Sequence, residues 1–199
     1  MKANFFFLAA LLSFSTMFMG CLTETPKGQK KLESTSRQWI AYNGGEKISF
    51  SNGDATISFT ATTRKSIFND VTDCYNVNAI KEVCDIYGME YDYMMFQTMG
   101  GQFRINYAIE KKLDNKNFND QLQVAVQEVD FPELKGTKTV NGTTANAQEM
   151  ELLASVKLNG KTFQNVYRQG NATTGQELYF AKGTGVVAFK SNNELWVKL

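Results

Sequence analysis

The stretch Met94–Tyr107, MMFQTMGGQFRINY, contains two runs of alternating residues separated by Gly100–Gly101. Two adjacent glycines between such runs are typical of a two-residue β-turn, because these turns need positive φ angles. The pairs that this turn predicts are Phe96 with Ile105, Met94 with Tyr107 and, on the opposite face, Gln97 with Arg104. Turn chemistry and hydrophobic alternation agree on one register, so the stretch predicts an antiparallel hairpin.

Three further turn signals follow the same logic, at Asn52–Gly53, Asn159–Gly160 and Asn192–Asn193. They predict pairing of Phe50 with Ala55 and Ile48 with Ile57, of Val156 with Phe163, and of Phe189 with Trp196. Other expected strands are 39–42, 122–129 and 178–181. The best helical spacing runs from Asn76 to Tyr87, with apolar residues at three- and four-residue steps. The predicted fold is mainly β: an antiparallel meander forming a sandwich, an open barrel or a curved sheet, with at most one short helix.

The N-terminus has the order of an export signal. Lys2 precedes an apolar run from Phe5 to Leu12, and no other charge occurs before Glu24. The residues Phe18-Met19-Gly20-Cys21 that end this segment resemble the lipobox of bacterial lipoproteins. Gly20 and Cys21 fit that motif, whereas Phe18 stands where Leu is usual and Met19 where a small residue is common. The resemblance implies cleavage before Cys21 and lipidation of its thiol.

Residues 22–36 are polar and lack an apolar period, which is typical of a flexible tether. The expected organisation is a signal peptide at 1–20, a lipid-anchored flexible linker at 21–36 and a single β-rich domain at 37–199. Membrane attachment through the lipid anchor places the protein in the cell envelope. Leu22, rather than Asp, follows the lipidation residue, and by resemblance to enterobacterial lipoproteins this favours the outer membrane. The periplasmic and surface faces remain open.

Composition narrows the possible chemistry. The net charge is +1 and Lys/Arg-rich runs are absent, which argues against nucleic acid as a partner. The chain contains no histidine, so Ser-His-Asp and Cys-His centres and His-ligated metal sites are excluded. We therefore expect no enzyme activity, no metal site and no cofactor. Carboxylate-based hydrolysis stays open, because Asp and Glu act as acid and base without histidine.

With Cys21 lipidated, Cys74 and Cys84 remain as a pair in an oxidising compartment and predict a disulfide. Acidic residues flank them, which raises the alternative of a Ca²⁺ site, although their spacing does not match an EF-hand and a solvated loop is favoured. These residues are Asp70, Asp73, Asp85, Glu90 and Asp92. A dense group of aromatic and Met side chains nearby could line an apolar ligand groove: Tyr87, Tyr91, Tyr93, Met94, Met95 and Phe96. The candidate ligand contacts are Met94, Phe96, Ile105 and Tyr107. Core packing is the competing interpretation for them.

Near the C-terminus, Leu158–Phe163 precedes Tyr179–Val187, in which Gly183-Thr184-Gly185 predicts a bend between two strands. This arrangement is similar to the ending of many small β-rich envelope lipoproteins of unknown function. The resemblance covers about the last quarter of the chain and implies an envelope location and a β fold, with no activity attached.

The sequence as a whole favours a membrane-anchored envelope lipoprotein with a non-catalytic binding or structural role. One alternative is a carrier of a lipid or other apolar ligand in a half-open β-barrel, and a second is a carboxylate-based hydrolase. An envelope protein or an apolar ligand is the expected partner.

Overall fold

The structure, a computed structural model, describes residues 23–77, 82–114, 116–142 and 149–199. The expected signal segment and the expected lipidation residue Cys21 lie outside the described residues, so both stay predictions. Among the described residues, no helix is long and apolar enough to cross a membrane.

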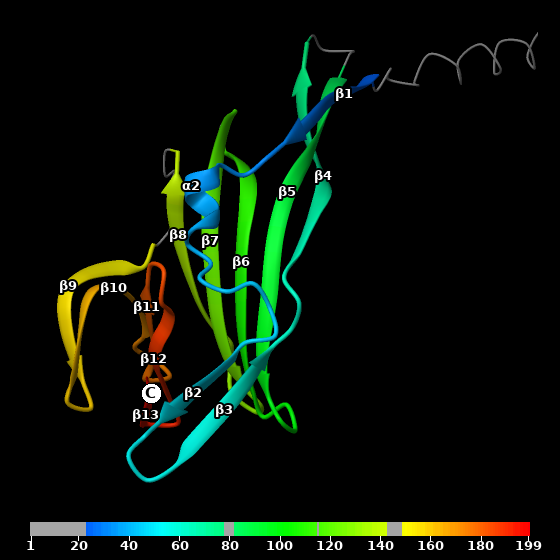
Figure 1. Cartoon of the computed structure of the whole chain (residues 1–199). Helices are drawn as coiled ribbons and strands as arrows, with labels where there is room; N and C mark the ends of the chain where they lie inside the picture. Colours follow the sequence, from blue (N-terminus) through cyan, green and yellow to red (C-terminus); the bar gives the residue numbers. More distant parts are fainter. Residues whose placement is uncertain (1–22, 78–81, 115, 143–148) are drawn as a thin grey trace, which may run out of the picture. The chain divides into compact units, whose positions relative to one another are not determined.

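The described chain is almost entirely β, as predicted (Figure 1). Its one α-helix is α2 (Ser34–Arg37). The strands are β1 (Thr23–Lys30), β2 (Lys47–Ser51), β3 (Thr56–Ala61), β4 (Lys65–Asn76), β5 (Glu82–Thr98), β6 (Phe103–Asp114), β7 (Asn117–Glu128), β8 (Leu134–Asn141), β9 (Glu151–Leu158), β10 (Lys161–Asn171), β11 (Gln176–Ala181), β12 (Gly185–Ser191) and β13 (Glu194–Lys198).

The described residues form two compact units. The hairpin unit contains the described residues of 23–29 and 70–88, and the sheet unit contains those of 30–69 and 89–199. Strands β4 and β5 pass through both units.

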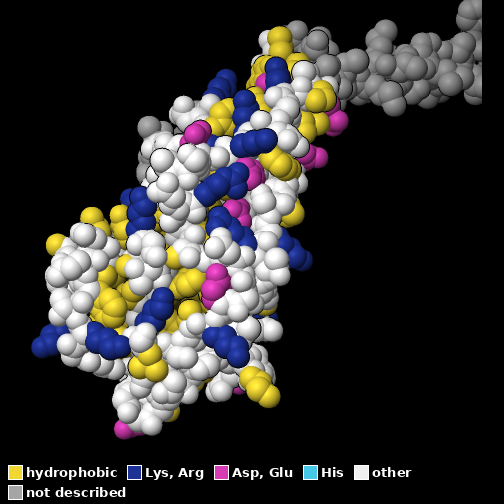
Figure 2. All heavy atoms as spheres, in the orientation of Figure 1, with side chains coloured by type: hydrophobic (Ala, Val, Ile, Leu, Met, Phe, Trp, Pro, Cys, Tyr) yellow, Lys and Arg dark blue, Asp and Glu magenta, His cyan; other side chains and the backbone are white. Residues whose placement is uncertain are grey.

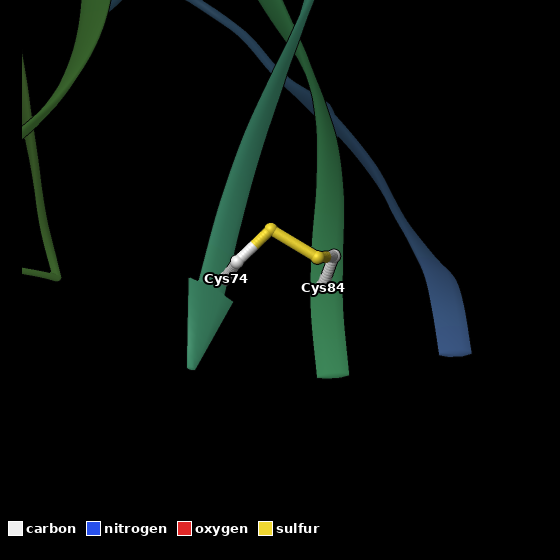
Figure 3. Close-up of a disulfide and its surroundings, with 2 residues drawn as sticks. All are labelled: Cys74 and Cys84. Atoms are coloured by element: carbon white, nitrogen blue, oxygen red, sulfur yellow. A yellow bond between two sulfur atoms is a disulfide. The ribbon is translucent and has the colours of Figure 1, made fainter. Parts of the chain in front are cut away.

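In the hairpin unit, β1 and β4 each pair with β5. The Cys74–Cys84 disulfide joins β4 to β5, with a Cα–Cα distance of 4.0 Å (Figure 3). The predicted helix over Asn76–Tyr87 is wrong, because β4 ends at Asn76 and β5 begins at Glu82. The helical spacing rested partly on Val77, which is 59% exposed, and on Ile80, which lies outside the described residues. β-branched residues such as Val77 and Val83 occur in helices and in strands. The pairing of β4 with β5, which the Cys74–Cys84 disulfide links, favours the strand here.

In the sheet unit the strands follow the order β8-β7-β6-β5-β3-β2-β13-β12-β11-β10-β9, and the sheet curls into a half-barrel. Each pairing along this order is antiparallel. The expected strands 122–129 and 178–181 correspond to β7 and β11. The predicted bend at Gly183-Thr184-Gly185 lies in the turn between β11 and β12.

Three of the four predicted hairpin registers are confirmed. Phe96 pairs with Ile105, Val156 with Phe163, and Phe189 with Trp196. The first register is wrong by two residues: Phe50 pairs with Ile57 and Ile48 with Phe59. Asn52 causes the difference, because its side-chain oxygen accepts hydrogen bonds from the backbone N–H groups of Asp54 and Ala55 and lengthens the loop to four residues. A shift of two keeps the apolar residues on one face.

The main hydrophobic core covers one face of the curled sheet. Residues from β5, β6 and β7 on this face include Phe96, Ile105 and Val124, each 0% exposed. The segment after α2 lies against them through Trp39, Ile40 and Tyr42. Each large apolar side chain in such a core stabilises the fold by roughly 1.5–3 kcal/mol relative to full exposure.

The predicted strand at 39–42 is wrong, although Trp39, Ile40 and Tyr42 are buried. These residues form a turn and an irregular segment that packs onto the sheet face instead of joining a ladder. The Tyr42 ring lies 4.8 Å from that of Phe96 and 5.5 Å from that of Tyr107. Its hydroxyl donates to the carbonyl of Thr184 at 2.7 Å.

The segment expected to be a flexible linker, residues 21–36, has regular structure over most of its described part. It contains β1 and most of α2. Leu32 and Ser36 are buried, and the Ser36 hydroxyl donates to Asp120 at 2.6 Å. Lack of an apolar period did not imply flexibility here, because polar side chains and backbone N–H groups bind carboxylates on the sheet. The linker prediction is therefore wrong for residues 23–36.

Strands β11, β12 and β13 contact a second hydrophobic cluster on their other face. It contains Val166, Tyr179, Val187, Ala188 and Val197 among others. The tip of the β9–β10 hairpin reaches β13, where the Lys161 ammonium donates to the carbonyl of Lys198 at 2.8 Å. Figure 2 shows hydrophobic side chains gathered in a hollow over this part of the sheet unit.

Candidate functional site

The four residues predicted as ligand contacts lie mainly in the core. Met94, Phe96, Ile105 and Tyr107 are each at most 1% exposed. The Tyr107 hydroxyl lies inside the fold, where it accepts a hydrogen bond from the backbone N–H of Val186 at 2.9 Å. The competing interpretation, core packing, therefore holds for these side chains. Successive side chains of a strand point to opposite faces, so the residues between them form the other face of the hairpin.

That other face contains a groove of about 650 Å³ over β5, β6, β7 and the start of β8. Its volume lies within the range of roughly 300–1,000 Å³ that is usual for small-molecule sites. The lining residues are Thr62, Thr63, Lys65, Tyr91, Tyr93, Met94, Met95, Asn106, Tyr107, Ala108, Gln123, Ala125, Glu133 and Lys135. All of them belong to the sheet unit.

Strand register explains why the surface is hollow there. One row of directly paired residues runs Tyr93, Ala108, Gln123, and the next runs Met95, Asn106, Ala125, Lys135. Ala108 and Ala125 therefore sit at the middle of the two rows, between larger side chains on either side. A methyl group at each position leaves space that a longer side chain would fill. The two alanines form the floor of the groove.

Tyrosines form the wall of the groove on β5. The rings of Tyr91 and Tyr93 have centroids 5.2 Å apart and are tilted by 31°. Both side chains are half-buried, so part of each ring remains open to a ligand. Burial raises the pKa of the Tyr91 hydroxyl, and the charge of Glu110 raises it further. The Tyr91 hydroxyl therefore stays protonated at neutral pH and can donate a hydrogen bond.

Polar groups complete the lining. Thr62 is fixed against β5, since its backbone N–H donates to the Met95 carbonyl at 2.7 Å and its hydroxyl accepts the Met95 N–H at 3.1 Å. The side-chain amide of Gln123 donates to Glu110. The charged lining residues are Lys65, Lys135 and Glu133, all exposed.

The acidic residues on the core face form ion pairs. Arg64 donates to both oxygens of Asp92, at 2.9 Å and 3.0 Å from Nε. Arg37 contacts Glu90 at 2.5 Å, and Lys111 contacts Asp120 at 2.5 Å. Glu90, Asp92 and Asp120 are buried, and each of these three carboxylates is bound by a cationic side chain.

Within this network, the pKa of Glu90 is set by its hydrogen-bond donors. Burial alone would raise the pKa of Glu90, but hydrogen bonds from Arg37, the Leu32 N–H and Ser66, together with the charge of Arg37, lower it below its ordinary value. A catalytic acid at neutral pH needs the opposite shift. Glu177 behaves in the same way: hydrogen bonds from Tyr179 and Arg168 outweigh burial and lower its pKa.

The acidic residues flanking the cysteines do not come together as a Ca²⁺ site. Asp85 pairs with Lys27 at 3.4 Å in the hairpin unit, whereas Glu90 and Asp92 bind arginines in the sheet unit. In the part of the chain that the structure describes, one group of potential metal ligands is close enough to share an ion: Cys74, Glu82 and Cys84. Both sulfurs of this group are joined in the disulfide, so neither is a thiolate ligand.

Tyr91, Tyr93 and Met95, which the sequence offers as possible lining of an apolar groove, do line the groove on this face. Asn106, Ala108 and Gln123 carry no such signal in the Met- and aromatic-rich run, and they come from the neighbouring strands β6 and β7. The small residues Ala108 and Ala125, which interrupt strands of larger residues, were the available signal.

The described residues form an antiparallel β protein with an open, side-chain-lined groove on its sheet. Comparison of the chain with protein-family models, with curated proteins and with solved structures gives no match.

Proposed function

We propose that this chain is a membrane-anchored lipoprotein of the cell envelope, and that it binds a ligand non-catalytically in the groove over β5–β8. The observation that supports binding is the groove itself, with its alanine floor and tyrosine wall. The observation that supports anchoring is the lipobox-like end of the N-terminal segment at Gly20–Cys21. Outer-membrane sorting remains part of the proposal through Leu22.

The buried ion pairs support a non-catalytic role. The three most buried carboxylates, those of Glu90, Asp92 and Asp120, are held by Arg37, Arg64 and Lys111. An Arg-bound carboxylate is a poor proton donor at neutral pH, because the cation favours its ionised form. Hydrolysis through these groups would first require breaking the network that fixes residues 32–37 to the sheet.

Anchoring is tested by metabolic labelling with a fatty-acid analogue. We expect incorporation into the wild-type chain and none into Cys21→Ser. Equal labelling of the two chains would contradict the assignment of Cys21.

Binding is tested by thermal unfolding of the full chain, purified in a zwitterionic, sugar-free detergent, with fractionated envelope extracts. The full chain is needed because β1, Leu32 and Glu33 are part of the fold. A ligand present at 100 times its Kd stabilises the folded state by about 2.7 kcal/mol. We expect one fraction to raise the melting temperature of the wild type and of Ala154→Leu, an exposed control on β9, but not of Ala108→Leu, which fills the groove. Stabilisation that survives Ala108→Leu, or no stabilisation by any fraction, would contradict the proposal.

A specific observation favours the carrier alternative as a second candidate. Leu153, Val156, Phe163 and Leu195 are only partly buried where they pack against the second cluster. Figure 2 shows hydrophobic side chains in a hollow over this part of the sheet unit. An apolar ligand fits that hollow better than the groove. A co-purifying lipid that lowers the solvent exposure of Phe163 but leaves that of Tyr93 unchanged would favour this alternative.

A further inference from the structure

The backbone of the groove floor is closed to ligands. Residues Tyr91–Gln97 of β5 pair with β6 throughout, and β6 pairs with β7 along its whole length. An extended peptide that binds by strand addition needs a free sheet edge, and the floor of this groove offers none. Recognition in the groove therefore depends on side chains.

The side chains combine ring faces with hydrogen-bonding groups. Tyr91 and Tyr93 present partly open rings beside the methyl-lined floor. The amides of Asn106 and Gln123 and the hydroxyls of Thr62 and Thr63 surround that floor. A wholly apolar ligand would remove these polar groups from water without replacing their hydrogen bonds, at about 1–3 kcal/mol for each unsatisfied group. A ligand with one apolar face and many hydroxyls satisfies both sets of groups, and a pyranose ring has this form.

The cations of the lining add a charge preference. Lys65, at the start of β4, and Lys135, in β8, lie on strands at opposite sides of the β5–β7 floor. Within the described residues neither ammonium has an ion-pair partner within 4.0 Å, and Glu133 offsets one of the two charges. A nucleic acid would need many more cations to displace its counterions. One or two carboxylates on the ligand match what the lining provides.

We propose that the groove binds an acidic oligosaccharide, with a sugar ring stacked on Tyr93, its hydroxyls bound by Asn106 and Gln123, and its carboxylates near Lys65 and Lys135. This assignment rests on the proposed binding function of the groove and names its ligand class.

The test is calorimetric titration of the full chain, in the same sugar-free detergent, with defined tetrasaccharides. The acidic probes are tetragalacturonate, tetramannuronate and a hyaluronan tetrasaccharide, and the neutral probe is maltotetraose. We expect at least one acidic probe to bind about tenfold more tightly than maltotetraose at low salt, and that advantage to shrink at about 0.5 M salt, where charges are screened within a few ångströms.

Matched variants locate the binding. Lys65→Gln and Lys135→Gln should each weaken the acidic probe about two- to fivefold, whereas Lys157→Gln on β9 should not. Tyr93→Ala should weaken it about tenfold through loss of the stacked ring. Ala108→Leu should abolish binding, and its control Ala154→Leu should retain it.

The outcomes separate the two proposals. Failure of all three acidic probes, or equal affinity for acidic and neutral ones, overturns the acidic-glycan assignment. If an envelope fraction still stabilises the wild type and not Ala108→Leu, the groove's binding function stands with another ligand. If neither the extracts nor the probes respond to Ala108→Leu, both proposals fall.

Discussion

Strands β5–β8 and strands β11–β13 belong to one curled sheet, yet they bury their faces differently. In β12 every residue except Lys190 is buried, and the strand lies between the two hydrophobic clusters. In β5, from Tyr91 to Phe96, buried and half-buried side chains alternate strictly. Strands β11–β13 use both faces for stability, whereas β5–β8 use one face for stability and leave the other open. The open face is where a binding site can exist without loss of the core.

Sequence pattern explains the difference. The run Gly185-Val186-Val187-Ala188-Phe189 has no polar residue, as expected for a strand buried on both faces. In β6, Arg104 and Asn106 alternate with Phe103, Ile105 and Tyr107, as expected for a strand with one face open. In β5 the alternation is one of burial, because Asp92 is buried in an ion pair and Met95 lies on the open face. Substitutions on the stabilising face should therefore change the free energy of unfolding more than substitutions on the open face.

The largest loss of stability should follow Asp120→Ala in β7. Asp120 is 0% exposed and binds Lys111, the Ser36 hydroxyl and the Glu33 N–H. Its removal leaves a buried ammonium without its partner, which destabilises proteins by about 3–5 kcal/mol. Urea unfolding monitored by circular dichroism measures this, with the exposed Asp54→Ala as control. A loss below about 1 kcal/mol would mean that the pair is solvated.

A smaller loss should follow Gly185→Ala at the start of β12. Gly185 has a φ of +84°, and an added Cβ would lie 2.4 Å from the Tyr42 hydroxyl oxygen. Gly183 in the same turn has a φ of +73° with open space around it. Both changes incur backbone strain of about 1–2 kcal/mol, and the clash adds about 1–3 kcal/mol to Gly185→Ala alone. Equal unfolding free energies for the two variants would contradict the packing of Tyr42 against this turn.

Two alanine substitutions compare the faces directly. Ala188 is 0% exposed in the second cluster, so Ala188→Leu overpacks it and should destabilise the protein by about 1–3 kcal/mol. Ala108→Leu extends into the groove instead and should change stability by no more than about 0.5 kcal/mol. The two unfolding curves test this difference. Equal destabilisation would show that the β5–β8 face is packed in solution.

The smallest effect is a pH dependence from Glu90 on the core face. Its pKa is lower in the folded state than the ordinary value of 4.5, because donors from Arg37, Leu32 and Ser66 outweigh burial. The ionised group therefore stabilises the fold above its unfolded pKa, and this stabilisation disappears as the pH falls through the lower folded pKa. Unfolding free energies between about pH 6 and pH 3 should fall less steeply in Glu90→Gln than in the wild type. Parallel profiles would contradict the ion-pair network.

Turn residues predicted the hairpin registers that depend on the turn alone. Asn159–Gly160 determines its register, since a two-residue turn leaves little freedom between Leu158 and Lys161. Gly100–Gly101 lies at the centre of the short loop between Thr98 and Phe103, and the register is symmetric about it. The Asn52 loop was wrong because a side-chain acceptor competes with the tight turn. The predictions of a strand at 39–42 and of a flexible linker were wrong because tertiary contacts decide these segments. The edge contact of the Tyr42 ring with Phe96 and the Ser36–Asp120 hydrogen bond join residues more than fifty positions apart.

Of the groove candidates that the sequence offers, Phe96 and Ile105 lie in the core, whereas Tyr91, Tyr93 and Met95 line the groove on the other face of the same hairpin. Alternation gives two faces but does not say what covers each. The cover of the core face is the segment around Trp39 and Tyr42, which has no periodic signal of its own. Once that face is covered, Tyr93, Met95 and Ala108 are left as the open surface.

The central claim, that the open face of β5–β8 is the binding surface, is tested most directly by methyl NMR of the full chain labelled at alanine and methionine. Titration with the acidic tetrasaccharides reports on both regions at once. If the groove binds these probes, we expect saturable chemical-shift changes of the Met95, Ala108 and Ala125 methyl groups and unchanged shifts of the Ala154 and Ala188 methyl groups. Shifts confined to Ala154 or Ala188, or none in the groove with any probe, would contradict it.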